Sequence, residues 1–195
     1  MIALFALAAA AAPYANMPQD ISIQAVHNFG ECVVKRTPRG AREVLSLDYN
    51  SPEYDKELRS YIRGHDYCMP FNGAISSREV LFAGALAEAM LKMDVRSSEL
   101  PQRLAYDPQR QMIAARGPAE AMALCTDFAA PQVTVRIFQT EPATPEESAA
   151  MQPLGGVLTD CLKKGAQVTI NKPALRSLLA LAAWRIVNTP RKPVS

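Results

Sequence analysis

The pattern of apolar and polar positions predicts a chain made mainly of helices. Two long stretches, residues 80–93 and 174–187, consist mostly of Leu, Ala, Phe, Met and Val. Helices of this composition are buried. A further predicted helix carries its large side chains mostly three residues apart, and they are Leu58, Tyr61, Ile62, His65 and Cys68. The sequence therefore predicts an all-α fold with two apolar helices at its centre.

Helix-start signals occur at matching places in the two halves of the chain. Ser51-Pro52-Glu53 and Thr144-Pro145-Glu146 each combine a capping hydroxyl, a proline suited to the first helical position and a carboxylate in the first turn. Cap-like residues also precede the two apolar helices, near residues 76–79 and 169–173. Each half is therefore expected to contain a capped helix followed by an apolar one.

The segment after the first proline of each half gives conflicting signals. Residues 40–45 are typical of a helix start, whereas the corresponding residues 133–138 are rich in Val, Thr and Ile and favour a strand. Ile75 and Val168 are candidates for short extended segments. We expect such segments to be minor additions to a helical fold.

The four cysteines indicate an internal duplication. Cys32 and Cys68 are separated by 36 residues, as are Cys125 and Cys161, and the second pair follows the first by 93 residues. Other identical residues are related by the same offset: Pro38 and Pro131, Pro52-Glu53 and Pro145-Glu146, Leu86-Ala87 and Leu179-Ala180, Ala89 and Ala182. Self-similarity at a fixed period is typical of repeated units. We therefore predict two tandem helical repeats, packed together about a pseudo-twofold axis.

The repeats set the predicted boundaries along the chain. A signal peptide, a first repeat, a linker, a second repeat and a flexible tail are expected at residues 1–15, 17–93, 94–117, 118–188 and 189–195. The linker has no counterpart elsewhere in the chain and is either a connector or a functional loop. Its candidates for docking on the core are Leu104, Tyr106, Met112 and Ile113.

Residues 1–15 have the character of a secretory signal. They carry no charge and end in a run of small residues. The usual basic residue is missing, since no Lys or Arg precedes Lys35, and the alternative is a short buried helix or a membrane anchor. A membrane span needs about 20 apolar residues, and polar residues end this stretch early. We expect a periplasmic or secreted protein with no transmembrane span in the mature chain.

The small net charge of the chain argues against nucleic acid as its partner. The 195 residues include 21 basic and 19 acidic side chains, with a formal net charge of +2, far from the clustered basic excess of a nucleic-acid binder. The densest basic cluster, formed by Lys35, Arg36, Arg39 and Arg42, is a candidate contact for anionic lipid, lipopolysaccharide or nucleic acid. An ordinary charged surface is favoured, because no aromatic residues are interleaved. The expected partner is an envelope protein or a small ligand, with no nucleic acid.

A structural disulfide in each repeat is the favoured role of the cysteines. Closing a loop of 36 residues stabilises a small unit by about 3 to 4 kcal/mol, and an even number of cysteines suits an oxidising compartment. The alternatives are a thiol nucleophile, a redox dithiol or a metal site, but the chain has no Cys-x-x-Cys pair. We predict the pairs Cys32–Cys68 and Cys125–Cys161.

The candidate reactive residues are His65 and Asp66. An imidazole beside a carboxylate is suited to act as a base, and with Met69 as a soft metal ligand. The favoured alternative is a histidine near the last carbonyls of a helix, because the second half has Leu158 at the position of His65. His27 is the other histidine, and no pair has the spacing of a helical metal site. No nucleophile-elbow, P-loop or zincin motif occurs, so no cofactor is expected.

Over residues 27–188 the chain shares a set of features with a group of known proteins. Its residues are Gly30-Glu31-Cys32, Pro38, Cys68, Cys125, Pro131 and Cys161, together with the helices after Ile75 and Val168. In these features the chain resembles uncharacterised two-repeat, four-cysteine secreted helical proteins of alphaproteobacterial type. The resemblance implies export and a helical duplication, and it brings no activity.

Taken together, the sequence favours a non-enzymatic periplasmic or secreted binding or structural scaffold. Such a scaffold would act through the groove between the repeats or through the linker. The alternatives are a small hydrolase or redox enzyme that uses His65 and Asp66, and a protein that binds a metal or haem derivative through His65 and Met69.

Overall fold

The computed structural model describes residues 19–69 and 79–192. Within these ranges the chain forms ten α-helices, one 3-10 helix and no β-strand, which confirms the all-α class. The elements are α1 (Gln19–Arg36), α2 (Pro38–Leu45), α3 (Pro52–Arg63), η1 (Asp66–Cys68), α4 (Glu79–Asp94), α5 (Leu100–Leu104), α6 (Pro118–Ala129), α7 (Pro131–Phe138), α8 (Pro145–Met151), α9 (Leu154–Cys161) and α10 (Lys172–Asn188). The predicted signal peptide, residues 1–15, lies outside the described ranges. No helix within them is long and apolar enough to cross a membrane.

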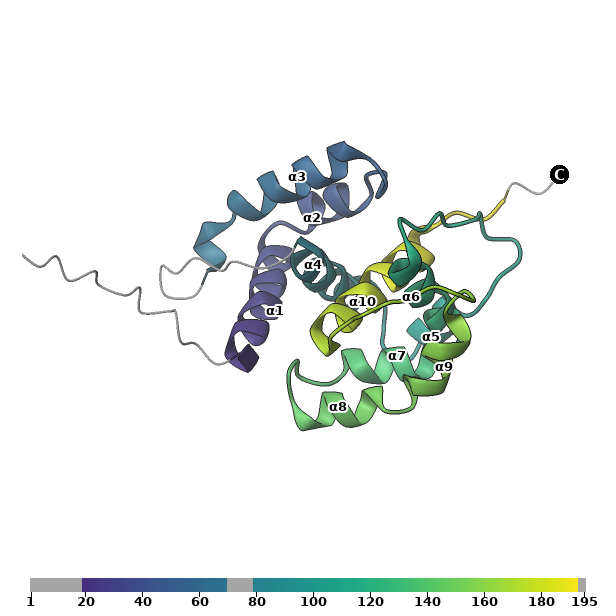
Figure 1. Ribbon diagram of the computed structural model, residues 1–195. Helices are drawn as coiled ribbons and strands as arrows, with labels where there is room; N and C mark the ends of the chain where they lie inside the picture. Colours follow the sequence, from purple (N-terminus) through teal and green to yellow (C-terminus); the bar gives the residue numbers. More distant parts are fainter. Residues whose placement is uncertain (1–18, 70–78, 193–195) are drawn as a thin grey trace, which may run out of the picture.

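The centre of the fold is the crossing of α4 and α10 (Figure 1). Helices α1, α2 and α3 pack around α4, whereas α5, α6 and α7 pack on α10. Every residue from Phe82 to Leu91 of α4 is buried, as is every residue from Leu175 to Trp184 of α10. A helix that is covered on all sides has to be apolar nearly all round. The composition of these two helices therefore accounts for their central position.

The backbones of α4 and α10 approach closely because Gly84 has no side chain. A Cβ atom added to Gly84 would lie 2.3 Å from the Cβ of Ser177 and 2.4 Å from its Cα. Two carbon atoms do not approach this closely without a bond, so only glycine fits the present crossing. Ser177 follows Gly84 by the same 93 residues that separate the two cysteine pairs.

Replacing Gly84 with alanine is expected to destabilise the protein by about 1 to 3 kcal/mol, because the added methyl group forces the central helices apart. Gly156 is the matched control: it also lies within a helix, but a Cβ there meets nothing within 4 Å. Alanine at position 156 is expected to stabilise the protein by about 0.5 to 1 kcal/mol. Urea unfolding followed by circular dichroism measures both values, and equal effects would contradict the close contact.

The predicted caps at Ser51 and Thr144 are confirmed, whereas the cap-like residues 76–78 lie outside the described ranges. The backbone N–H of Tyr54 donates to Ser51 Oγ at 3.1 Å, and the N–H of Glu147 donates to Thr144 Oγ1 at 3.2 Å. Helices α7, α8 and α10 begin 93 residues after α2, α3 and α4. The local rules that start a helix therefore act at matching positions.

The halves differ in the helix that follows this cap. Helix α3 is continuous from Pro52 to Arg63, whereas the second half has α8, which ends at Met151, and then α9. Pro153 lies between α8 and α9. Proline has no N–H to donate and its ring clashes with the preceding turn, which explains the break.

The strand suggested for residues 133–138 is wrong, because these residues form most of α7. Pro131 supplies the first helical position, and four of the six residues are buried against neighbouring helices. Their burial outweighs their strand propensity. Val168 lies in irregular chain, and Ile75 lies outside the described residues.

The cysteines form the two predicted pairs. Cys32 is bonded to Cys68 and Cys125 to Cys161, with Cα–Cα distances of 5.7 and 5.6 Å. The first bond joins α1 to η1, and the second joins α6 to α9. Because all four sulfur atoms are paired, none is a free thiol nucleophile. Two disulfides are compatible with an oxidising compartment.

Part of the linker between α4 and α6 packs against the core. Helix α5 buries Leu100 and Leu104, which confirms the docking predicted for Leu104. Ile113 is partly buried against the core. Tyr106 and Met112 do not dock, because their side chains are 72% and 92% exposed. The linker therefore presents two large apolar residues at the surface.

The described part of the tail is paired with the linker. Arg110 and Arg191 form an isolated antiparallel bridge. On either side of it, the N–H of Gln111 donates to the carbonyl of Pro190, and the N–H of Lys192 donates to that of Gln109. These contacts lie within the tail predicted at residues 189–195, of which 193–195 are outside the described ranges, and they hold the linker beside the end of α10.

Charged side chains are buried where α1, α4, α8 and α10 meet. The Arg176 guanidinium donates to Glu88 at 2.6 and 2.8 Å and to Glu147 at 2.8 Å. Lys92 Nζ lies 2.9 Å from Glu88, and His27 Nδ1 lies 3.8 Å from it. Burial alone would lower the pKa of Arg176, but its hydrogen bonds with the two carboxylates outweigh burial and raise it. Arg176 is therefore charged and paired in the interior.

Stability is expected to depend on pH through His27. Burial lowers its pKa from 6.5 to about 4, with Arg176 and Lys92 also opposing the proton and the Glu88 and Glu147 carboxylates favouring it. Between pH 6.5 and 4 the unfolded chain therefore binds more protons than the folded chain, so the contribution of neutral His27 to stability is fully present above pH 6.5. It should fall by about 3 kcal/mol as the pH drops to 4.

Urea unfolding at a series of pH values tests this dependence. The His27→Gln variant should lack about 3 kcal/mol of the loss seen in the parent protein over this pH range. Other titrating groups are shared by the two proteins and cancel in the comparison. An identical pH dependence in both would show that His27 is not the group responsible.

Candidate functional site

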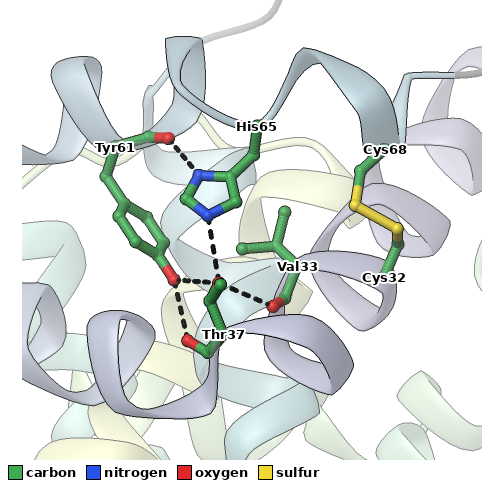
Figure 2. The surroundings of a disulfide bond; sticks show 6 residues. All are labelled: Cys32, Val33, Thr37, Tyr61, His65 and Cys68. Atoms are coloured by element: carbon green, nitrogen blue, oxygen red, sulfur yellow. Dashed lines mark hydrogen bonds between the residues drawn. A yellow bond between two sulfur atoms is a disulfide. The ribbon is translucent and has the colours of Figure 1, made fainter.

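His65 lies at the end of α3, beside the first disulfide (Figure 2). Its Nδ1 is 2.6 Å from the carbonyl oxygen of Tyr61, and its Nε2 is 3.0 Å from Thr37 Oγ1. A carbonyl only accepts hydrogen bonds, so Nδ1 carries a hydrogen. The imidazole, two residues beyond the end of α3, therefore binds one of the last carbonyls of that helix, as expected for a helix-end histidine.

The partners of His65 are themselves held in place. The Tyr61 hydroxyl lies 2.8 Å from Thr37 Oγ1 and donates to the Thr37 carbonyl at 3.0 Å, while Thr37 Oγ1 lies 3.0 Å from the carbonyl of Val33 (Figure 2). Gly40 leaves room for the tyrosine ring, since a Cβ there would lie 2.8 Å from its Cε2. The cluster joins the corner between α1 and α2 to the end of α3, which is a structural role.

Neither Asp66 nor Met69 is placed to act together with His65. Asp66 is exposed. Both Asp66 and His65 are described by the structure, and no hydrogen bond joins the Asp66 carboxylate to the His65 ring. Both ring nitrogens of His65 already have protein partners, so neither is directed at Met69 or at an open metal position. The described part of the chain holds no group of three or more His, Cys, Asp or Glu residues that could bind a metal ion.

The arginines of the basic cluster in α1 and α2 each contact a different partner. Arg39 pairs with Glu43 at 2.9 Å, and Arg42 pairs with Asp94 at 2.8 Å. The Arg36 guanidinium lies over an aromatic ring, 5.0 Å from its centre. The cluster therefore has the character of an ordinary charged surface.

A hollow of about 410 Å³ lies between the linker and α6. We call it the linker hollow. Its lining includes Tyr106, Arg110, Met112, Ile113, Leu124 and Phe128. Leu124 and Phe128 are four residues apart on α6, so they share one face of that helix. Cys125 of the second disulfide also lines the hollow, which anchors this side of it.

The linker hollow has an exposed apolar border. Met112 and Tyr106 are the two most exposed large apolar side chains in the described ranges, at 92% and 72%. The Tyr106 ring meets Phe128 edge to face, with the ring centres 5.9 Å apart. Clustered apolar exposure of this kind marks binding surfaces.

Two cations border the hollow without a carboxylate as hydrogen-bond acceptor. The Arg110 guanidinium donates to the backbone carbonyls of Arg103 and Ile186, and Lys192 Nζ donates to the carbonyl of Pro108 at 3.2 Å. Partial burial lowers the pKa of Arg110, but an arginine remains charged in proteins. This end of the hollow is therefore positively charged.

The acid nearest to these cations is already engaged. Asp107 accepts from the backbone N–H of Gln109 at 2.9 Å and from the Arg191 guanidinium at 2.9 Å. These two contacts hold the pKa of Asp107 below its usual range. Asp107 also lines the hollow and attracts Arg110 as well as Arg191. Arg110, Arg191 and Lys192 therefore share this one carboxylate, and cations are in excess at this end of the hollow.

From the sequence, the linker is either a connector or a functional loop, and no sequence pattern indicates the other sides of the hollow. The linker was a candidate functional loop, and Met112 and Arg110 lie in it. Phe128 and Lys192 belong to α6 and to the tail, so only the fold brings them to the linker. The spacing of Leu124 and Phe128 was the one available signal that they share a face.

Comparison with protein-family models, with curated proteins and with solved structures finds no match to this chain.

Proposed function

We propose that the protein is a non-enzymatic binding scaffold and that the linker hollow is its binding surface. The observation that carries the proposal is the position of Met112 and Tyr106. The two most exposed large apolar side chains of the described residues border the same hollow, above an apolar floor. Burying such residues against a ligand or partner is favourable by about 25 cal/mol per Å².

We further propose that this scaffold works in the periplasm or outside the cell. Both disulfides would persist there, and the uncharged residues 1–15 have the composition of a secretory signal. The absence of a membrane-spanning helix in the described ranges is compatible with this location.

The two halves of the chain are proposed to descend from one duplicated helical unit. This idea is supported by the equal cysteine spacing and by the helix starts that recur after 93 residues. It is also supported by the contact between Gly84 and Ser177, which are equivalent positions under that offset. Residues equivalent by a twofold axis meet each other where the axis passes. The linker has no equivalent in the first half, so a function added after duplication would be located there.

Photocrosslinking tests whether the linker hollow binds anything in the cell. Benzoylphenylalanine is placed at position 106 of the full chain in its native compartment, and adducts are identified by intact mass, so that protein and small ligands are both detected. We expect an adduct that Met112→Glu abolishes and that the control Met93→Glu leaves unchanged. Because Met112 is 92% exposed, its replacement should alter stability by less than about 0.5 kcal/mol.

Two outcomes would contradict the proposal. One is the absence of any adduct at position 106. The other is an adduct of equal yield in Met112→Glu, because binding would then not involve the apolar border of the hollow. A circular dichroism melt of each variant confirms that it is folded.

A further inference from the structure

We propose that the linker hollow binds a single-chain amphiphile with a carboxylate head group, that is, a fatty acid. The alkyl chain would lie on the apolar floor and the carboxylate would meet Arg110 and Lys192. This inference rests on the proposed function, because it names the ligand class of the same surface.

The floor and walls of the linker hollow suit an alkyl chain. Ile113, Leu124 and Phe128 supply apolar side chains to the lining, and the exposed Met112 and Tyr106 also line it. Methionine is flexible and adapts its shape to an apolar ligand. The volume of about 410 Å³ falls within the range of about 300 to 1,000 Å³ found for pockets that bury small ligands. A single chain would therefore find enough apolar surface.

The charged end of the hollow suits a carboxylate. Arg110 has five N–H donors, and its contacts are with two neutral carbonyls. Its Nε is buried and has no hydrogen-bond partner among the described residues. Lys192 likewise donates to a carbonyl. Hydrogen bonds between ionised groups are roughly twice as strong as those between neutral groups, so a carboxylate at this end would be preferred to a neutral head group.

Other ligand classes fit less well. A cationic amphiphile would place like charges beside Arg110 and Lys192, and an alcohol would add no counter-charge to the excess of cations over Asp107. An acidic peptide would satisfy the charges, but an extended peptide needs a row of side-chain pockets or an open strand edge. The linker hollow offers one apolar recess with one basic end.

Calorimetric titration of the full chain tests the assignment. The probes are dodecanoate, dodecanol and dodecyltrimethylammonium, each below its micelle-forming concentration. We expect dodecanoate to bind most tightly, by about tenfold or more over dodecanol, because only its head group is charge-matched. The alcohol isolates the contribution of the chain, and the ammonium probe tests the sign of the charge.

Two variants separate the two ends of the ligand. Lys192→Gln should weaken the binding of dodecanoate by about tenfold and leave the affinity for dodecanol unchanged. Met112→Glu should weaken the binding of both. Lys163→Gln and Met93→Glu are the controls, since Lys163 is exposed on a different loop and Met93 lies at the end of α4. Both controls should bind dodecanoate as the parent protein does.

The outcomes distinguish this inference from the proposed function. Equal affinity for dodecanoate and dodecanol, or an affinity for dodecanoate that Lys192→Gln does not change, would overturn the carboxylate assignment. If no amphiphile binds but position 106 crosslinks to a protein, this inference fails and the proposed function stands. If neither is observed, both fail.

Discussion

Replacing Arg176 with methionine is expected to lower the free energy of unfolding by about 3 to 5 kcal/mol. Arg176 is fully buried and is the counter-ion of two carboxylates that are themselves 2% and 3% exposed. Without it, Glu88 keeps Lys92 as a partner, but among the described residues Glu147 keeps only the backbone N–H of Ala143 as a partner for its carboxylate. A buried carboxylate without a counter-charge is costly, and this cost is the main source of the expected loss.

Two further variants test that explanation. Arg59→Met removes an exposed pair, since Arg59 and Glu79 are each about half exposed, and should cost less than about 1 kcal/mol. Adding Glu88→Gln and Glu147→Gln to Arg176→Met should recover part of the lost stability, because no unpaired charge then remains buried. Urea unfolding at pH 7 measures all of these variants. A loss no larger than that of Arg59→Met would refute the buried charge as the cause.

Replacing Cys125 and Cys161 together with alanine is expected to cost about 4 kcal/mol, because the bond closes a loop of 36 residues in the unfolded chain. Cys32 and Cys68 close a loop of the same length, so the same cost is expected for them. Losing both bonds would remove about 8 kcal/mol, which approaches the whole stability of a typical domain. The variant without any cysteine is therefore expected to be largely unfolded at 37 °C.

Thermal and urea unfolding of the two double variants provide the measurement. Treating the parent protein with a reductant under native and then denaturing conditions is the control, because it removes the same bonds without changing packing around alanine. A cost below about 1 kcal/mol for either pair would show that its half is held by packing alone. Widely different costs would show that strain or packing, rather than loop length, decides the contribution.

Most of the fold was predictable because its signals are local. The caps at Ser51 and Thr144 depend on a few neighbouring residues, and the positions of α4 and α10 follow from their composition. Helix α7 was not predictable in this way, because Val and Ile have strand propensity and only tertiary burial decides the outcome. The ionic network was also missed, since Glu88 and Arg176 are separated by 88 residues.

The candidate site was predictable only in part. The linker was identified as a possible functional loop because it has no counterpart in the other half. Its apolar residues were expected to dock, but Tyr106 and Met112 are exposed. The basic end of the linker hollow depends on the pairing of Lys192 with the linker, which joins residues that are far apart in sequence. The sequence pattern of His65 and Asp66 was more conspicuous, yet the contacts of His65 are structural.

Neither disulfide crosses from one half of the chain to the other, so the linker is the sole covalent connection between them. The halves are also joined by non-covalent contacts, which include the packing of α4 against α10 at Gly84 and the buried ion pair between Glu88 and Arg176. Proteolytic cleavage at the exposed Met112 would therefore yield two fragments, each with its own disulfide, that remain associated without a covalent bond.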